Sequence, residues 1–452
     1  MKTVALVILL LLLLSLRFVF LDHNESNYIN GQVVSFKATL MQEPKISGRM
    51  QRFSVYGPSK ERIFITTSRL PEFHYAQTLL IAGPIEFFPR KSEGRINGAS
   101  TTISNQREKL LSSENVVLAM NFPKIEAVKN DVKVTGNHFR LVLNATSFIR
   151  GKISLFFQKN LPPSSSGLLL GIVFGIKQDI PGTFSENLRI SGVYHVIAAS
   201  GMNVTMVGGF LSAFFLLFFK RQTALIFSIV SILFYALLAG LEPSIVRASI
   251  MAILAFLASI LGRQKLAIYS LFIAAYLMLF FSPDLLSSIG FQLSFISTLG
   301  LLYIKPLIEG KGAFKKILDK SVVGEDLTAT VSAQAATLPI LLLNFGTYSL
   351  WSVLVNLLVL WSVPLLMILG GFGAFFGFVF EPIGKIFLYF SLPLLLYFEK
   401  TVNFFGQKGG VVNLERVPVQ FVFSYYLFLM AVLIFLLRDP AKKKWETGSV
   451  KP

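Results

Sequence analysis

The segment from Ile190 to Gly209 reads ISGVYHVIAASGMNVTMVGG, and it stands where a membrane-crossing helix is expected. In lipid every unpaired polar group is costly, so a segment this polar should face protein or a water-filled cavity. Gly201 can break a helix, and small residues let two backbones approach closely. Two interpretations follow: a helix–helix contact joined by hydrogen bonds, or a discontinuous helix that lines a polar path. The polar side chains and glycines are His195, Ser200, Asn203 and Thr205, with Gly192, Gly201, Gly208 and Gly209.

The composition around this segment is that of an integral membrane protein. Of 452 residues, 53% are hydrophobic and 13% aromatic, and only 15% are charged. Soluble proteins carry roughly 25% charged residues. The low fraction of charged residues shows that most of the chain does not have the composition of a soluble enzyme.

Charge and cysteine usage narrow the chemistry further. The net charge is +18, and part of it is topological because cytoplasmic loops collect Lys and Arg. The remainder is available to a polyanion. The absence of cysteine excludes disulfides, thiol catalysis and thiolate metal sites. The histidines have no pair with the spacing of a helical zinc motif, so we expect no metal and no cofactor; they are His23, His74, His138 and His195.

The first third of the chain divides into an anchor and a β-rich region. Residues 1–20 are predicted to be an N-terminal transmembrane anchor, with the amino terminus inside. Residues 21–138 contain short alternating runs broken by Gly and Pro, which predict β-strands. About five strands fit an extracytoplasmic, all-β, OB-like domain. Its aromatic side chains either fill the core or stack on the bases of a single strand; they are Phe36, Phe53, Tyr56, Phe64, Phe73 and Tyr75.

An amphipathic helix is predicted for residues 139–160. This stretch carries basic residues, no acidic residue and an apolar side. Such a helix lies in the membrane interface with its basic side toward lipid phosphate. DNA is the other polyanion that the basic side could meet.

Residues 161–438 are predicted to form the transmembrane domain. The apolar stretch from Ser166 to Ile176 is shorter than the roughly 20 residues of a span, so it is predicted to be a re-entrant or packed half-helix. With the N-terminal anchor, the further spans make about ten transmembrane helices, some of them broken or re-entrant. The spans are Tyr194–Phe219, Ala224–Ala239, Ser244–Leu261, Leu266–Phe281, Ser288–Tyr303, Ala329–Leu343, Ser362–Phe380, Ile386–Phe398 and Phe421–Leu437.

The distribution of charge supports this polytopic α-helical membrane fold. With the count above, the Lys- and Arg-rich loops all fall inside, as does the basic cytoplasmic tail of residues 439–452. The β-rich region falls outside by the same count. The protein is therefore predicted to be a multi-pass protein with an extracytoplasmic N-terminal domain.

The central segment resembles the signature of the ComEC family of DNA-uptake membrane proteins. That signature reads roughly G-x-hydroxyl-H-hydrophobic-hydrophobic-A-x-S-G-L-H/N, and most of its positions match here. Tyr194 replaces the usual small hydroxyl residue and Met202 replaces the leucine. Asn203 stands where many members have a second histidine, and an amide cannot ionise. The matching residues are Gly192, His195, Ala198, Ser200, Gly201 and Asn203.

Further motifs of the same family follow in matching order between Leu168 and Leu365. The β-rich region adds a weaker similarity to the domain that precedes the channel in this family. The motifs are GLEPSIVRA from Gly240 to Ala248, SPD from Ser282 and GFQLSF from Gly290, then SAQ at Ser332 to Gln334 with Pro339 and Phe345-Gly346, and finally Asn356 with Pro364.

The resemblance implies a function. A member of this family is expected to be a bacterial inner-membrane channel that conducts single-stranded DNA into the cytoplasm during natural transformation. Its partners would be single-stranded DNA, membrane lipids, a cytoplasmic translocase ATPase and an extracytoplasmic DNA receptor. The residues expected to line the DNA path are His195, Ser200, Gly201, Asn203, Arg247, Gln292, Ser294 and Gln334.

The chain is not expected to be an enzyme. Full-length family members commonly add a metallo-β-lactamase-like domain, and this sequence resembles a short form without it, with no HxHxDH string. Each polar residue also has a purely structural interpretation: Arg247 can pair with Glu242 or snorkel to headgroups, and buried amides can join helices. Contact of Arg247 with a phosphate group is the third interpretation of this residue. The alternative functions are a small-solute permease and a membrane-embedded hydrolase that uses His195 and Ser200, although their spacing does not share a helix face.

The predicted topology can be tested with single cysteines, because the chain has none of its own. Asn97→Cys, in the β-rich region, should react with an impermeant thiol reagent on intact cells, and Ser321→Cys should not. Labelling of Ser321→Cys without labelling of Asn97→Cys would overturn the topology.

Overall fold

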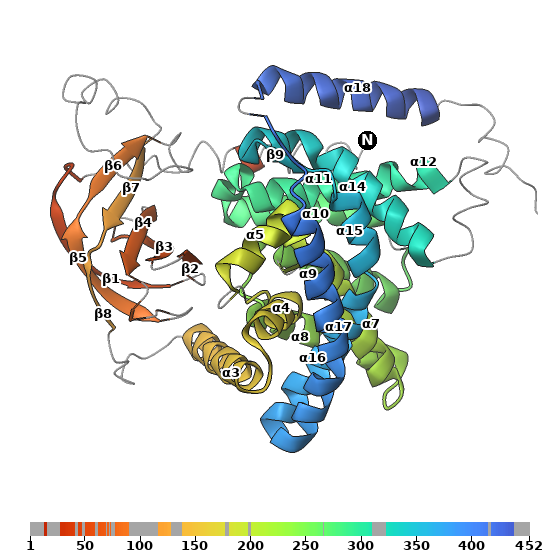
Figure 1. Ribbon diagram of the computed structural model, residues 1–452, viewed down its shortest axis with the longest axis horizontal. Helices are drawn as coiled ribbons and strands as arrows, with labels where there is room; N and C mark the ends of the chain where they lie inside the picture. Colours follow the sequence, from red (N-terminus) through yellow and green to blue (C-terminus); the bar gives the residue numbers. More distant parts are fainter. Residues whose placement is uncertain are drawn as a thin grey trace, which may run out of the picture. The chain divides into compact units, whose positions relative to one another are not determined.

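A computed structural model shows two compact units: residues 16–154, and residues 155–452 together with residues 1–15. The first unit contains β-strands and the second is almost entirely helical (Figure 1). The structure describes residues 13–15, 28–40, 44–47, 50–58, 62–68, 70, 71, 73, 77–89, 116–127, 138–176, 180–197, 200–264, 266–309, 322–414 and 417–437.

The strands of the β unit form two sheets. One has the order β1-β5-β8 and the other the order β2-β3-β4-β7-β6. All neighbours are antiparallel except β4 and β7, which run parallel with Ile63 opposite Leu118. The strands are β1 (Val33–Thr39), β2 (Lys45–Ser47), β3 (Met50–Tyr56), β4 (Arg62–Ser68), β5 (Thr78–Pro84), β6 (Glu86–Pro89), β7 (Val116–Asn121) and β8 (Lys124–Ala127).

Alternating residues of these strands build one hydrophobic core. Phe36, Phe53 and Phe73 all belong to it, so for these three the core-filling interpretation holds. Tyr56 is exposed at 52%, and Phe64 is half-buried. Tyr75, the last aromatic candidate, lies outside the described residues.

The spans expected from the sequence correspond to helices of the helical unit, but several ends differ, and the span expected at Ile386–Phe398 lies within a helix of 27 residues. Its helices are the end of α3 (His138–Asn160), then α4 (Pro163–Phe174), α5 (Gly182–Ile190), α6 (Tyr194–Ile197), α7 (Gly201–Leu216), α8 (Arg221–Leu238), α9 (Pro243–Ile260), α10 (Ala267–Phe281), α11 (Ile289–Tyr303), α12 (Lys305–Glu309), α14 (Val322–Phe345), α15 (Ser352–Val359), α16 (Ser362–Val379), α17 (Glu381–Gln407) and α18 (Val419–Leu437). A 3-10 turn, η2 (Pro283–Ser287), precedes α11, and two short strands, β9 (Thr347–Ser349) and β10 (Val411–Asn413), pair with each other.

Six helical segments of the described chain are long and apolar enough to cross a membrane: α8, α9, α11 with α12, α14, α16 and α17. Three more predicted spans correspond to shorter apolar helices, α7, α10 and α18. The predicted anchor at residues 1–20 lies outside the described residues except for residues 13–15. The protein is thus a mostly helical membrane protein with an N-terminal β region.

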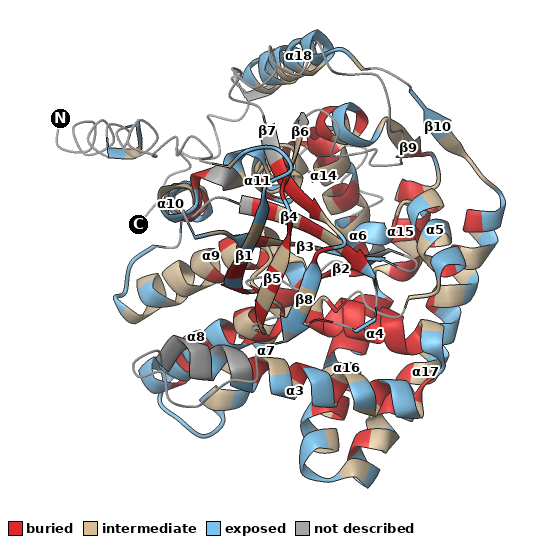
Figure 2. Cartoon of the chain, turned by 90° about the vertical axis from the view of Figure 1, so that its left-hand side faces the viewer, coloured by how far each residue is buried: buried red, intermediate tan, exposed pale blue. Residues whose placement is uncertain are grey.

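Helix α4 is the buried centre of the helical unit. Every residue from Ser165 to Phe174 is buried, and Figure 2 shows the helix in the buried colour. It packs against α6, α16 and α17. Gly370 of α16 makes this approach possible, because a Cβ there would lie 2.7 Å from a methyl group of Val173. Twelve residues span only about 18 Å, so α4 is a packed half-helix, as its length predicted.

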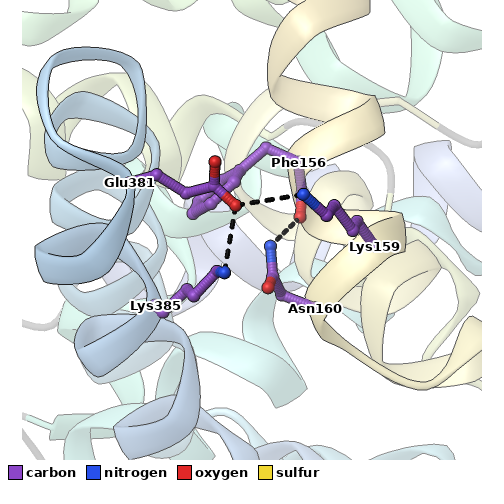
Figure 3. A network of polar contacts seen from close by, with 5 residues as sticks. All are labelled: Phe156, Lys159, Asn160, Glu381 and Lys385. Atoms are coloured by element: carbon purple, nitrogen blue, oxygen red, sulfur yellow. Dashed lines mark hydrogen bonds and ion pairs between the residues drawn. The ribbon is translucent and has the colours of Figure 1, made fainter.

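The end of α3 is fastened to the hairpin of α16 and α17. Lys159 Nζ lies 3.3 Å from Glu381 Oε1, and Lys385 Nζ lies 3.0 Å from the same oxygen (Figure 3). The ring of Phe156 covers Gly377, where a Cβ would lie 2.3 Å from a ring carbon. Exposed ion pairs contribute little stability, so the ring contact is the stronger part of this attachment. The predicted place of α3 in the membrane interface stays a prediction.

Helix α14 contains Pro339 and continues through it. Proline has no N–H, so the carbonyl of Ala335, four residues earlier, loses its helical partner. The hydroxyl of Tyr425 donates to this oxygen at 2.8 Å, and the hydroxyl of Tyr426 donates to Ala336 O at 2.9 Å. Helix α18 therefore supplies the hydrogen bond that the proline removes, which is how proline is tolerated inside membrane helices.

The role of Tyr425 can be measured with a double-mutant cycle. Tyr425→Phe should lower the free energy of unfolding by about 1–2 kcal/mol, because it leaves the Ala335 carbonyl unpaired. In a Pro339→Ala background the new N–H bonds that carbonyl, so the same change should cost clearly less. Tyr269→Phe, at a tyrosine that is 64% exposed, is the control. An equal cost of Tyr425→Phe in both backgrounds would contradict this account.

Candidate functional site

The central segment is two helices and not one. Helix α6 ends at Ile197 and α7 begins at Gly201, with Ser200 in an extended conformation at φ −108° and ψ 166°. The span predicted from Tyr194 to Phe219 is therefore interrupted at Ser200, as the interpretation of a discontinuous helix expects. The break brings side chains of two short helices to one place.

Asn203 and Tyr235 complete the end of α4. Gly175 ends this helix in a left-handed conformation, and the N–H groups of Gly175 and Ile176 bond to carbonyls of the last turn. Two of the carbonyls that follow receive side-chain donors. Asn203 Nδ2 donates to Ile172 O at 2.7 Å, and the Tyr235 hydroxyl donates to Val173 O at 2.9 Å.

Asn203 thus joins α7 to α4, as the helix-joining interpretation of the central segment expects. Its side chain is only 2% exposed, and its Oδ1 accepts a hydrogen bond from Ser200 Oγ at 3.1 Å. A neutral amide suits this position because it offers a donor and an acceptor without a charge. A role of Asn203 in a DNA path stays a prediction.

Arg247 is buried within the first turns of α9, with 7% of its surface exposed. Its Nη1 donates to the backbone oxygen of Ser294 and to the hydroxyl of Thr298, both on α11. No ion pair among the described residues includes Arg247, so the expected pairing with Glu242 is not among them. The expectation of snorkelling also fails, because the guanidinium binds a neighbouring helix instead.

Gly201 lies directly against this guanidinium. A Cβ on Gly201 would lie 2.7 Å from Arg247 Nη2 and 3.3 Å from the Cβ of Ala248. Only glycine leaves room for this approach. The structure therefore brings together five of the residues predicted from the sequence: Ser200, Gly201, Asn203, Arg247 and the backbone of Ser294.

Gln334 belongs to a second network, which reaches Gly192 near the start of the central segment. Its Nε2 donates to Ser352 Oγ at 2.7 Å, and its Oε1 accepts from the Tyr348 hydroxyl at 2.9 Å. The Ser352 hydroxyl lies 3.2 Å from Gly192 O. Gly192 has φ +78°, and a Cβ there would lie 2.5 Å from the Cβ of Ser352. This network fixes the turn that leads into α6.

The two remaining candidates lie outside the Arg247 cluster, although His195 has a hydrogen bond to the backbone of Gly192. His195 lies on α6 with an exposed side chain. Gln292 is half-buried near the start of α11, where its Nε2 donates to Leu286 O at 2.9 Å. Neither residue contacts the Arg247 cluster through a hydrogen bond among the described residues.

Sequence reasoning missed several members of the site. Thr298 and Tyr235 bind through hydroxyls inside apolar helices, and a buried tyrosine hydroxyl needs a partner, which is the signal that marks Tyr235. A carboxylate was also missed: Glu399 Oε1 accepts from Ser165 Oγ at 2.5 Å between α17 and α4. An ionisable residue within an apolar span was the available signal. Among the described residues, no three His, Asp or Glu side chains come close enough together to hold a metal ion.

Comparison with known proteins identifies relatives over most of the helical unit. The family model described as Competence protein matches residues 172–439. The chain is 24% identical over 341 residues to ComE operon protein 3 of Bacillus subtilis (strain 168), a match that covers 75% of this chain and 41% of that protein. It is 31% identical over 210 residues to an uncharacterized protein of Aquifex aeolicus (strain VF5), covering 44% of this chain and 49% of that protein.

These matches span half or less of the length of each relative. No solved structure matches the chain.

The contribution of Asn203 can be measured as stability. Asn203→Leu should lower the free energy of unfolding in detergent by about 1–2 kcal/mol, because the Ile172 carbonyl loses its donor inside an apolar bundle. The matched control is Thr205→Val on the same helix, since Thr205 is exposed and bonds only to carbonyls of its own helix. Equal stability of Asn203→Leu and the parent protein would show that the hydrogen bond from Asn203 to Ile172 O does not stabilise the contact between α7 and α4.

Proposed function

The chain belongs to the competence protein family of the ComEC type, and on that premise we propose that it conducts single-stranded DNA across the bacterial inner membrane into the cytoplasm during natural transformation. The observation that carries the proposal is the family match over residues 172–439, which contains α6, the break at Ser200, α7 and Arg247. A broken helix with polar groups at membrane depth is tolerated where it lines a cavity or is packed in protein.

The residues of the break divide into two roles in this proposal. His195 is exposed and Ser200 and Gly201 are half-buried, so these three face the strand. Asn203 is buried and holds α7 to α4, so it positions the wall. Neutral donors and acceptors solvate a sliding polyanion without trapping it, which suits a conduit better than a row of fixed charges.

The strand order supports an OB-like fold for the β unit. We count β1 with β2, β5 with β6, and β7 with β8 as single bent strands, so that five strands remain. Their pairings then run first–second–third–fifth–fourth and return to the first, with the third and fifth parallel. A five-stranded Greek-key barrel of this kind is the OB-fold, and many such barrels bind oligonucleotides. In our proposal this unit is extracytoplasmic.

The apolar helices support a multi-pass arrangement. The six long segments together with α7, α10 and α18 make the nine spans expected beyond the N-terminal anchor, hence about ten in all. The basic loops between them favour a cytoplasmic location for Lys220, Arg221 and Arg263. The partners we propose are the DNA strand, membrane lipids, a cytoplasmic translocase ATPase and an extracytoplasmic DNA receptor.

The proposal gives the chain no catalytic step. A hydrolase would need Ser200 activated by His195, within hydrogen-bond reach. The Ser200 hydroxyl instead donates to Asn203 Oδ1. A small-solute permease remains the alternative conduit, and the size of the cargo separates the two.

The function can be tested in a transformable strain that lacks the gene. The intact gene should restore entry of labelled DNA into the cytoplasm, and a Ser200→Trp variant should not, because the indole fills the break. The control is Leu217→Trp, since Leu217 is 77% exposed just beyond α7. Membrane abundance is measured for each variant. Normal DNA entry in the deletion strain would refute the proposed function. Normal DNA entry with Ser200→Trp protein at normal abundance in the membrane would refute the proposal that the strand passes Ser200.

A further inference from the structure

The guanidinium of Arg247 is a buried cation whose donors are only partly used. It carries five N–H groups and no acceptor. Nη1 is bound by Ser294 O and Thr298 Oγ1, while Nε has no hydrogen-bond partner among the described residues. Burial removes most of the water that would otherwise solvate the charge. A buried charge without a counter-charge is costly, so a bound anion would relieve it.

The first turn of α7 lies against the same guanidinium and presents backbone N–H donors. One of them, the N–H of Asn203, already bonds to Ser200 O at 3.1 Å. The first N–H groups of a helix have no partner within that helix, and the helix dipole makes this end positive. Ser200 precedes the helix without capping it, because its hydroxyl donates to the Asn203 side chain. The first turn contains no acidic residue. The positive end of the α7 dipole is therefore not neutralised by an acidic side chain of the same helix turn.

Gly201 joins the two features into one site. Because it has no side chain, the Nη2 atom of Arg247 reaches the first residue of α7, where a Cβ would lie 2.7 Å away. Access exists on the α7 side, since Gly201 is half-buried and Met202 is 38% exposed. Helix N-termini and the fork of arginine are both well suited to phosphate oxygens.

We propose that Arg247 and the N-terminus of α7 bind one phosphodiester group of the DNA strand. This inference rests on the proposed function, which supplies the strand, and adds to it a discrete contact point. The site lies where α7, α9 and α11 pack, with Arg247 buried among them, and this favours a strand that enters the protein. A lipid headgroup would instead be met by a long basic side chain on an exposed face.

Binding to the purified full chain in neutral phosphatidylcholine nanodiscs tests the site. The probes are a labelled ten-residue oligothymidylate and its uncharged methylphosphonate analogue. Arg247→Gln should weaken binding of the charged probe by about tenfold to a hundredfold, as expected for lost charge-assisted hydrogen bonds. The slope of log K against log salt should fall in magnitude by about 0.7, the value for one phosphate on a single strand. Wild-type affinity and slope in Arg247→Gln would overturn the site.

The control for charge alone is Arg263→Gln, an exposed arginine just after α9, which should have a smaller effect. An equal loss of affinity in both arginine variants would show that only the net charge of the protein matters, and it would overturn the site. A second pair of variants keeps Arg247 in place. Gly201→Ala should weaken the charged probe, because its methyl group fills the position beside Nη2, whereas Gly209→Ala has nothing within 4 Å and should bind normally. Normal binding by Gly201→Ala would also overturn the site.

Two further outcomes separate the site from its alternatives. If phosphatidylglycerol in the nanodiscs abolishes the difference between wild type and Arg247→Gln, the anion is a lipid headgroup and the proposal fails. If Arg247→Gln binds DNA normally while cells lacking the gene still fail to take up DNA, the site fails and the proposed function stands. If cells lacking the gene take up DNA normally, the proposed function fails. The proposed phosphate site then fails with it, because the protein would have no DNA strand to bind.

Discussion

The helical unit depends on side-chain donors that give backbone carbonyls a partner where water is scarce. The end of α4 exposes the carbonyls of Ile172 and Val173 inside the bundle, and Asn203 and Tyr235 donate to them. Pro339 frees a carbonyl in α14, and Tyr425 donates to it. In each case the donor comes from another helix, so meeting the requirement also fixes how the helices pack. The half-helix α4 can be the centre of the fold because its last turn is completed from α7 and α8.

Glycines also allow close approaches between segments of the unit. Gly201 admits the Arg247 guanidinium, and Gly192 admits Ser352. Gly300 lets α11 approach α14, because a Cβ there would lie 2.6 Å from the Cβ of Ala336. The polar residues of the central segment consequently do two kinds of work. Asn203 and the Gly192 turn hold the segment in place, whereas His195 is exposed and Ser200 is half-buried.

The sequence predicted the helices well, because long apolar runs separated by basic loops have few other structures open to them. It also predicted an interruption near Gly201, since polar groups and glycines together disfavour a continuous lipid-facing helix. It could not predict the partners of the polar side chains. The acceptors of Asn203, Tyr235 and Tyr425 are backbone oxygens, which have no signature in the sequence. The pairing of Arg247 with Glu242 was wrong for a related reason. Glu242 is near in sequence, but the Arg247 side chain donates to a backbone oxygen of α11. Strand register in the β unit was equally out of reach, because alternation identifies a strand and not its neighbour.

The central claim is that the interrupted segment of α6 and α7 lines the path of the DNA strand. It is tested most directly by cross-linking a strand arrested in passage, using a thiol-reactive group on the DNA and single cysteines in a chain that has none. A cysteine in place of His195 should form an adduct with the strand, and a cysteine in place of Phe435, which is 77% exposed on α18, should not. An adduct at position 435 with none at position 195, in protein that still takes up DNA, would contradict the account.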